Sequence, residues 1–453
     1  MPKKTARSRR KKSASRTSQP TLNSDAAGID LGATVHYVAV PADRDPQPVQ
    51  HFGTLTENLQ ALADWLQACG ITTVAMEATG VYWIPLFQIL EDRGFEVCLV
   101  NARHVKNVPG RKSDVQDCQW LQYLHSVGLL NASFRPPAAV CAVRSLVRHR
   151  ESLMRTGCEH LLRVQKALDQ MNVQLHHAVT DITGVTGLAI LDAIVAGERD
   201  AKVLAAHRDR RCKKTEAQIA KALLGDWREE HLFTLRQSLQ AWRFHQQLMA
   251  ECECQINELM SGLEDLSEDM APAPTKKGNK RPDESMRQRL FAKFGVDLTA
   301  IEGVSIQTVL AFLSEVGTDV SKFATAEHFA SWLGLCPDNR ITGGRTHAAH
   351  TRKVNNRLAT ALRMAAQSLH RSKSALGDWF RRIRAKLGTK AAVTAAAHKL
   401  ARVLHAMIKH RSPYDPGRIG NPELRLARKE RSLRRQAEQL GFTLIPAEEG
   451  QVS

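Results

Sequence analysis

The sequence predicts an α/β domain at the N-terminal end of a chain that is otherwise almost entirely helical. Between Asp25 and residue 137, short apolar runs bounded by glycine and polar residues alternate with helical segments. From residue 138 onward, apolar residues recur at the three-and-four spacing of long helices. The chain has 453 residues, of which 43% are hydrophobic, which is ample material for packed cores in roughly three domains of ~150 residues.

The elements of the α/β domain follow a simple order: three strands, then helix, strand, helix, strand and helix. Strands are predicted at 26–33, 34–40, 48–54, 71–78 and 95–100, and helices at 57–69, at 81–92 and from near Ser113. This succession fits a ribonuclease-H-like layered sheet. In that arrangement the first and fourth strands are parallel neighbours and the last helix lies beside them.

Two long helical seams are predicted in the middle of the chain, at 138–177 and 232–266. Arg150 and Gly157 interrupt the first seam and weaken it locally. The seams pair either with each other or with a partner subunit, and the sequence leaves both open. In chain order we predict a basic disordered arm (1–23), the ribonuclease-H-like α/β domain (24–137), a coiled-coil dimerisation region (138–267), a flexible linker (268–289), a helical C-terminal domain (290–415) and a basic tail (416–453).

The charge of the chain points to a polyanionic partner. The formal net charge is +18, and the first twenty residues hold eight Lys or Arg and no acid. Such an excess suits nucleic acid, because neutralised phosphates release counterions; a merely basic surface would have the same composition. No apolar stretch is long enough to span a membrane, and the basic arm lacks the apolar core of a secretory signal. The nine scattered cysteines form no disulfide framework and indicate a reducing compartment.

Four carboxylates fall at the ends of predicted elements. Asp30 lies in the first strand, Glu77 ends the fourth, and Asp114 and Asp117 stand on one face at the start of the last helix. A ribonuclease-H-like sheet brings these positions to one edge. Carboxylates this close together repel one another unless divalent cations neutralise their charge. Sites made of oxygen ligands suit Mg²⁺ or Mn²⁺. Two such ions activate an attacking oxygen and stabilise a leaving one in phosphoryl transfer.

Each acid also has a simpler explanation. Asp114 and Asp117 would interact favourably with the positive end of their helix. Asp30 precedes Leu-Gly and would also suit a turn. Glu77 would also suit the N-terminal cap of the following helix. The combination of all four positions favours the metal site.

A second candidate site is the stretch "DNRITGGRTH" (338–347), which we place as a loop between two helices. Thr342 offers a hydroxyl beside two glycines, in an arrangement typical either of a plain turn or of a nucleophile on a flexible backbone. Basic residues follow this stretch directly. We interpret them as the start of a helix that contacts phosphates, although the solvent-exposed face of an ordinary helix would have a similar sequence. The predicted nucleic-acid-binding residues are Gly343, Gly344, Arg345, His347, His350, Arg352, Lys353 and Arg357.

At these residues the chain resembles a known family. "GIDLGATVHYVAV", "MEATGVYW" and "GRKSDVQDCQWLQ" contain the four acids. They resemble the DEDD transposases of bacterial insertion sequences of the insertion-sequence-110 and -1111 type, whose N-terminal domain is RuvC-like. The likeness continues through "ITGVTGLAILDAIVAGERD" to "WLGLCPDNRITGGRTHAAHTRKVNNRLATALRMAA". It covers nearly the whole chain except the basic arm and the C-terminal tail.

The resemblance implies a DNA recombinase that excises and inserts its own element, guided by a non-coding RNA of that element. It implies dimers that pair into a tetramer, Mg²⁺ or Mn²⁺ held by Asp30, Glu77, Asp114 and Asp117, and a bacterial, cytoplasmic, nucleoid-associated location. In the family a serine forms a covalent phosphoserine intermediate with DNA. That serine falls where this chain has Thr342, which keeps the hydroxyl but adds a methyl group that stiffens χ1.

Three functions therefore remain open. The first is an RNA-guided recombinase in which Thr342 replaces the serine. The second is a junction nuclease that uses only the acids, metal and water. The third is a catalytically silent nucleic-acid-binding protein.

Overall fold

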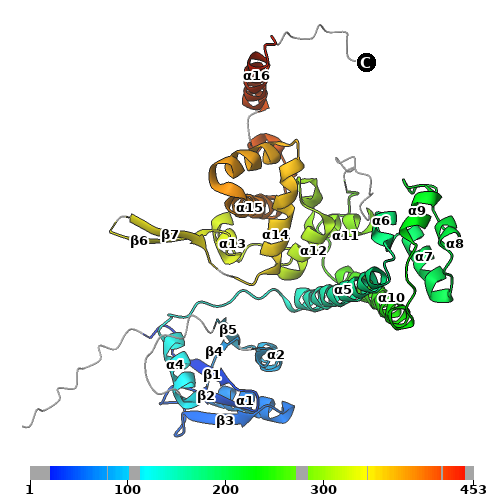
Figure 1. Cartoon of the computed structure of the whole chain (residues 1–453). Coiled ribbons are helices and arrows are strands. Elements are labelled where there is room, and N and C mark those ends of the chain that lie inside the picture. The colour runs from blue at the N-terminus through cyan, green and yellow to red at the C-terminus, as the bar shows by residue number, and fades with distance from the viewer. Residues whose placement is uncertain are drawn as a thin grey trace, which may run out of the picture. The chain divides into compact units, whose positions relative to one another are not determined.

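The computed structural model describes residues 21–78, 80–101, 113–271, 284–343, 345–352, 354–419 and 422–443. The chain divides into two compact units, Met1–Arg135 and Pro136–Ser453, and this division lies close to the boundary predicted at residue 137. Figure 1 shows the α/β elements in the first unit and the helical elements in the second. Among the described residues, no helix combines the length and the apolar character needed to cross a membrane.

The first unit contains a mixed five-stranded sheet with strand order β3-β2-β1-β4-β5. The first three strands form an antiparallel meander, and β4 and β5 run parallel to β1. The predicted succession of elements is confirmed, and the topology is consistent with a ribonuclease-H-like sheet. The elements are β1 (Ala26–Leu31), β2 (Val35–Ala39), β3 (Val49–Gly53), α1 (Thr56–Ala68), β4 (Thr73–Glu77), α2 (Trp83–Asp92), β5 (Glu96–Val100) and α4 (Asp114–Ser126).

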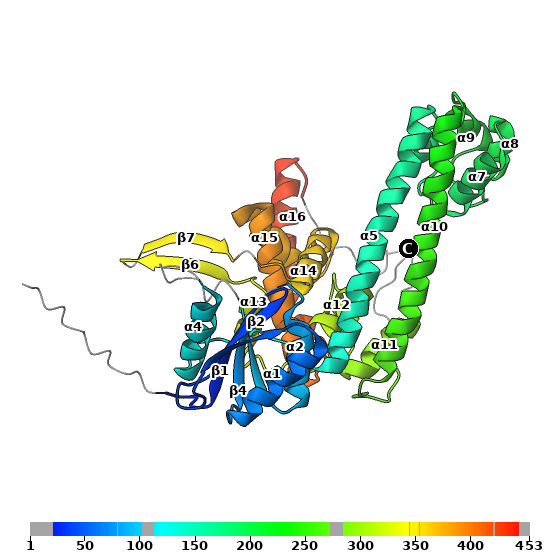
Figure 2. The ribbon, with the colours of Figure 1, turned by 90° about the horizontal axis from the view of Figure 1, so that it is seen from below.

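The two faces of this sheet are covered by different helices (Figure 2). Ile29 of β1 and Met76 of β4 are fully buried in a core shared with leucines of α1 and α2. The opposite face of β1 receives α4, and Gly28 allows the approach. A Cβ at Gly28 would lie 2.2 Å from the Gln122 nitrogen and 2.4 Å from the Cys118 oxygen, both on the α4 backbone.

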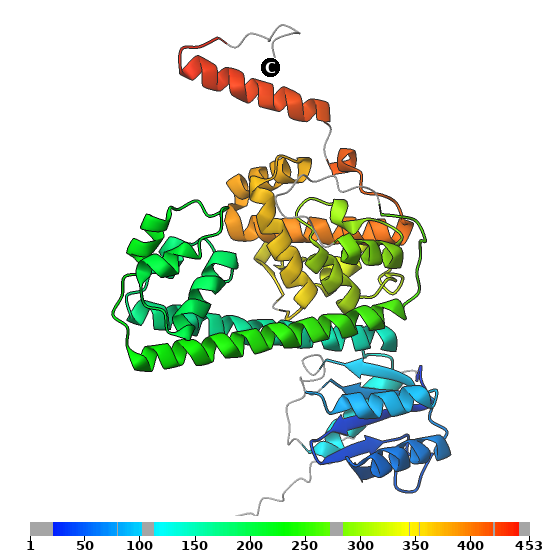
Figure 3. The ribbon, with the colours of Figure 1, turned by 90° about the vertical axis from the view of Figure 1, so that its right-hand side faces the viewer.

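The two predicted seams pair within the chain. Helices α5 (Ala138–Gln170) and α10 (Glu229–Ser261) lie side by side along their length (Figures 2 and 3). Both interruptions of the first seam contact α10. Arg150 donates to Glu253 at 2.7 Å, and a Cβ on Gly157 would lie 3.4 Å from the His245 side chain. One end of the pair carries α6 (Leu175–Ala178), α7 (Val185–Ala196), α8 (Ala201–Ala206) and α9 (Glu216–Ala222).

A helical cluster follows, and an ion pair ties it to α5. Arg148 donates to both carboxylate oxygens of Glu315 at 3.0 and 2.8 Å, and Arg144 donates to the backbone oxygens of Ser314 and Glu315. The first helix of the cluster begins inside the predicted linker (268–289), so that linker ends earlier than expected. The helices are α11 (Glu284–Phe294), α12 (Ile306–Glu315), α13 (Ala326–Trp332), α14 (Arg357–Ser368), α15 (Ala375–His410) and, as the basic helix expected in the tail, α16 (Pro422–Gln439).

The expectation of a loop followed directly by a helix at the Thr-Gly-Gly stretch is wrong. The chain forms a β-hairpin there, from β6 (Pro337–Thr342) and β7 (Arg345–Thr351), and α14 begins only at Arg357 (Figure 1). A Gly-Gly pair between two strands favours a tight hairpin turn because glycine tolerates positive φ, and Gly343 has φ +57°. The basic residues 345–351 therefore lie on a strand rather than on a helix.

Candidate active site

Asp30 and Glu77 lie at the carboxyl ends of two neighbouring parallel strands. In the β1–β4 register Ile29 is opposite Met76, and Asp30 and Glu77 are the next residues along each strand. Side chains alternate between the faces of a strand. Because Ile29 and Met76 point into the core beneath α1 and α2, the two carboxylates point to the opposite face, where α4 packs.

Helix α4 runs antiparallel to these strands and is fixed at its C-terminal end. The Gln122 side chain donates to the Ala26 oxygen at 3.2 Å, and His125 Nε2 is 2.8 Å from Thr73 Oγ1. Eight residues of helix from His125 back to Asp117 span about 12 Å. The four strand residues from Thr73 to Glu77 span about 13 Å. Asp117 therefore lies level with the ends of β1 and β4.

The thiol of Cys118 gives a second indication that Asp30 of β1 lies near α4. Cys118 is buried on α4, and its pKa is raised from 9.0 to about 12, first by burial and then by the negative charge of Asp30, with a smaller contribution from Asp117. Two carboxylates from different elements thus act on one buried group.

Two of the simpler explanations for the acids are wrong. Asp30 lies within β1 rather than in a turn, and Glu77 lies within β4. The N-cap of α2 is Tyr82, with no side-chain capping bond. Asp114 and Asp117 do occupy the first turn of α4, whose N-cap Ser113 accepts from the Gln116 nitrogen, so a favourable helix-dipole interaction remains for these two.

The donor chemistry of the site fits a hard divalent cation. Carboxylate oxygens from β1, β4 and α4 are the ligands that Mg²⁺ and Mn²⁺ prefer. Within the described part of the chain, which omits residues 79 and 102–112, no three or more His, Cys, Asp or Glu side chains are gathered closely enough to hold a metal. Asp30 and Glu77 lie at one edge of the sheet, and the described side chains form no closed ligand set there.

Thr342 and the predicted nucleic-acid-binding residues lie in different environments. Thr342 ends β6 opposite Arg345, with Gly343 in the turn between them. Arg352 donates to the Ser331 oxygen at 2.6 Å, and Arg357 forms an ion pair with Glu151 of α5. Both are therefore engaged within the protein. His347 and His350 belong to β7, whereas Gly344 and Lys353 lie outside the described residues.

The acids and the hairpin belong to different units of the chain. Asp30, Glu77, Asp114 and Asp117 are in the first unit, and Thr342 is in the second. Sequence reasoning also missed a pocket of about 1000 Å³ in the second unit, lined by His398, Lys399 and Arg402 of α15. The signal that points to it is Gly388, a glycine with φ +79° and ψ 171° inside a long helix.

Both units match models of transposase families. Residues 27–173 match a model described as "Transposase" of the DEDD IS110 type, and residues 297–380 match "Transposase IS116/IS110/IS902 family". The first match contains all four acids, and the second contains the hairpin. Both models describe transposases, the first of them of the DEDD class, and the fold of the first unit agrees with that class. Within that class, the chain belongs to the IS110-type family.

Two relatives are similar over shorter stretches. A "Probable family 20 transposase" of Pseudomonas aeruginosa is 29% identical over 125 residues, which are 26% of this chain and 37% of that protein. An "Insertion element IS110 uncharacterized 43.6 kDa protein" of Streptomyces coelicolor is 31% identical over 121 residues, which are 26% of this chain and 29% of that protein. The alignments thus span about a third of each relative.

Proposed function

We propose that this protein is a DNA transposase that cuts and rejoins phosphodiester bonds, with Asp30, Glu77, Asp114 and Asp117 as its cation ligands. The observation that carries the proposal is the placement of Asp30 and Glu77 in one parallel register, with Asp117 level with them on α4. When bound, Mg²⁺ or Mn²⁺ would activate the attacking oxygen and stabilise the leaving one. The role of the chain is to hold the carboxylates at one edge of a rigid sheet.

Thr342 is the proposed nucleophile for a covalent DNA intermediate. Its place at the end of β6, next to the turn at Gly343, supports the proposal because small residues let a phosphate backbone approach closely. In this step the Thr342 oxygen forms a bond to phosphorus, the deoxyribose oxygen leaves, and the hydroxyl proton passes to solvent or a base. The extra methyl group of threonine would slow the attack relative to serine.

We further propose an element-encoded guide RNA, a dimer that pairs into a tetramer and an association with the bacterial nucleoid. The net charge of +18 supports a nucleic-acid partner. The exposed faces of α5 and α10 carry large apolar side chains, such as Leu162 (70% exposed) and Phe244 (56% exposed), and these favour a subunit contact along the helix pair.

The test is cleavage and strand joining between DNA carrying the element ends and target DNA, with the non-coding RNA and Mg²⁺ present. Asp30→Asn should abolish cleavage, and Thr342→Ala should abolish the covalent protein–DNA adduct on denaturing gels. Thr342→Ser should keep or raise activity. Asp92→Asn, an exposed acid at the end of α2, is the matched control and should behave as wild type.

The other two functions predict different results. Metal-dependent cleavage that persists in Thr342→Ala without any adduct would identify a junction nuclease. Nucleic-acid binding without cleavage, insensitive to Asp30→Asn and to removal of Mg²⁺, would identify a catalytically silent binding protein and reject the proposal.

A further inference from the structure

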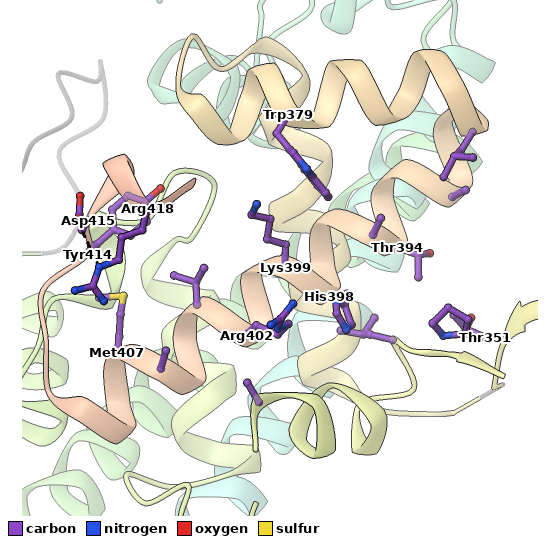
Figure 4. Close-up of a pocket in the computed structure, with 18 of the residues that line it drawn as sticks. Thr351, Trp379, Thr394, His398, Lys399, Arg402, Met407, Tyr414, Asp415 and Arg418 are labelled. Carbon is purple, nitrogen blue, oxygen red and sulfur yellow. Dashed lines mark ion pairs between the residues drawn. The ribbon is translucent and has the colours of Figure 1, made fainter. Parts of the chain in front are cut away.

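The pocket in the second unit lies between two arms of one bent helix. Gly388 interrupts α15 with φ +79° and ψ 171°, so the arm that carries Trp379 turns back over the arm that carries Lys399 (Figure 4). The Lys399 ammonium lies 4.9 Å from the centre of the Trp379 ring. The cavity measures about 1000 Å³, at the upper end of the ~300–1,000 Å³ usual for small-molecule sites.

The walls of the pocket combine small apolar residues with cations. Ala391, Ala395 and Ala406 line it and leave room for a flat group beside Trp379. Four of its lining residues are Lys or Arg, whereas only one is acidic: Lys390, Lys399, Arg402 and Arg418 against Asp415.

This excess of positive charge is only partly compensated within the protein. Arg402 pairs with Glu327 at 2.8 Å and Arg418 with Asp415 at 3.5 Å. Burial lowers the pKa of the Lys399 ammonium, and the positive charges of Arg402 and Arg382 lower it further. An anion bound beside Lys399 would relieve this repulsion.

His398 adds a polar group suited to a base edge. Burial lowers the pKa of its imidazole, with Arg402 contributing in the same direction, which favours the neutral ring at pH 7. A neutral imidazole both donates and accepts a hydrogen bond. The pocket thus offers an aromatic face, a donor–acceptor pair and cations within one cavity.

We propose that this pocket binds one unpaired nucleotide of a nucleic-acid strand, with the base beside Trp379 and the phosphate on Lys399 and Arg402. This inference rests on the proposed function, because it assumes a nucleic-acid substrate. A base inside a duplex cannot enter such a cavity without leaving its stack. Pro337 and Thr351 are opposite each other where β6 begins and β7 ends, and both residues line the pocket. The held nucleotide would therefore lie at the base of the hairpin that carries Thr342.

The test measures binding of fluorescein-labelled oligothymidine, oligouridine and a duplex of mixed sequence to the full chain. Ala395→Trp fills the cavity, and Lys399→Gln removes one phosphate contact. The matched controls are Ala385→Trp and Lys386→Gln, which change exposed positions on the same helix outside the pocket. Circular dichroism melting checks that every variant is folded.

Ala395→Trp should weaken single-strand binding by about tenfold, because it removes the space for one stacked base. Lys399→Gln should weaken it by a similar factor, because it removes one phosphate contact. Lys399→Gln should also reduce the salt dependence by about 0.7 in the log–log slope for a single strand. Duplex binding and the controls should remain unchanged. A larger loss for oligouridine would assign the pocket to RNA, and a larger loss for oligothymidine would assign it to DNA.

Single-strand binding unchanged in both folded pocket variants would overturn the proposal. Equal losses for duplex and single strands would also overturn it, because they would indicate general phosphate attraction. As a second measurement, an oligonucleotide carrying 5-iodouracil should crosslink to the peptide that contains Trp379. Cleavage assays with Asp30→Asn test the proposed transposase function independently of the pocket. Loss of cleavage in this variant would support the role of the acids whether or not the pocket binds a nucleotide.

Discussion

At the scale of single residues, Gly28 decides how closely α4 approaches the sheet. Its position opposite the backbone of Cys118 and Gln122 leaves no space for a side chain. Asp30 follows two residues later on the same strand face, and Asp117 precedes Cys118 on the helix. The close approach at Gly28 therefore sets how near α4, which carries Asp117, lies to the strand that carries Asp30.

Gly28→Ala should therefore destabilise the first unit and displace the acids of α4. Overpacking of a close contact costs ~1–3 kcal/mol, and here the obstacle is rigid backbone. We expect a lower urea midpoint for the first unit and loss of cleavage. Gly262→Ala at the end of α10 is the control, because its Cβ would meet nothing closer than 3.5 Å. A wild-type midpoint for Gly28→Ala would show that α4 packs elsewhere.

His125 makes the stability of the first unit depend on pH. Burial lowers the pKa of its imidazole below 6.5, with a weaker opposing effect of Glu96. The unfolded chain therefore binds a proton that the folded unit excludes, and stability is lost as the pH falls below 6.5. His36 is buried and shifted in the same direction.

The free energy of unfolding should fall between pH 7 and about pH 5, by up to ~1.4 kcal/mol per pH unit for each excluded proton. His125→Gln keeps a hydrogen-bonding group near Thr73 but does not titrate, so its pH dependence should be smaller than that of wild type. Urea titrations at both pH values measure the difference. Identical slopes for the two proteins would contradict the buried neutral imidazole.

At the scale of elements, Glu315 connects α12 to the long helix α5. Its side chain is 8% exposed and is held by Arg148, which is 43% exposed, while Arg144 donates to backbone oxygens at the same point. The helix pair is thereby fixed to the helical cluster that carries the hairpin. Arg357 of α14 adds a second tie, to Glu151 of α5.

Glu315→Gln should destabilise the second unit by about 2–3 kcal/mol. This is less than the ~3–5 kcal/mol expected for a fully buried pair, because solvent reaches Arg148. Asp192→Asn, which breaks the exposed Asp192–Arg243 pair between α7 and α10, should change stability by under ~1 kcal/mol. Thermal melts of both variants measure the two losses of stability. Equal losses would show that the pair of Glu315 and Arg148 contributes no more than an exposed ion pair.

The elements also show where sequence reasoning succeeded and where it failed. The strands of the first unit were predictable because their apolar runs end at glycine and polar residues. The hairpin was missed because residues 338–347 were placed as a loop between two helices and the basic residues after Gly344 as the start of a helix, although the Gly343-Gly344 pair favours a turn between strands. The bend in α15 depends on one left-handed glycine, Gly388, which helical periodicity does not detect.

At the scale of the whole molecule, the chemistry is divided between two units. The four acids occupy the first, and Thr342 and the pocket proposed to bind a nucleotide occupy the second. The sequence predicted the elements that carry the acids, since Asp30 lies on β1, Glu77 on β4 and Asp114 and Asp117 on α4. It did not predict the geometry of a metal site, because carboxylates repel one another without a cation and their final positions depend on the ion.

The most direct test of this account is Mn²⁺ binding, measured by electron paramagnetic resonance on the purified chain. Wild type should bind Mn²⁺, and Asp30→Asn and Asp117→Asn should each weaken binding by at least about tenfold, a change of ~1.4 kcal/mol. Asp92→Asn should bind as wild type does. If Asp30→Asn and Asp117→Asn bind Mn²⁺ as tightly as wild type, the acids share no cation, and the proposed active site is wrong.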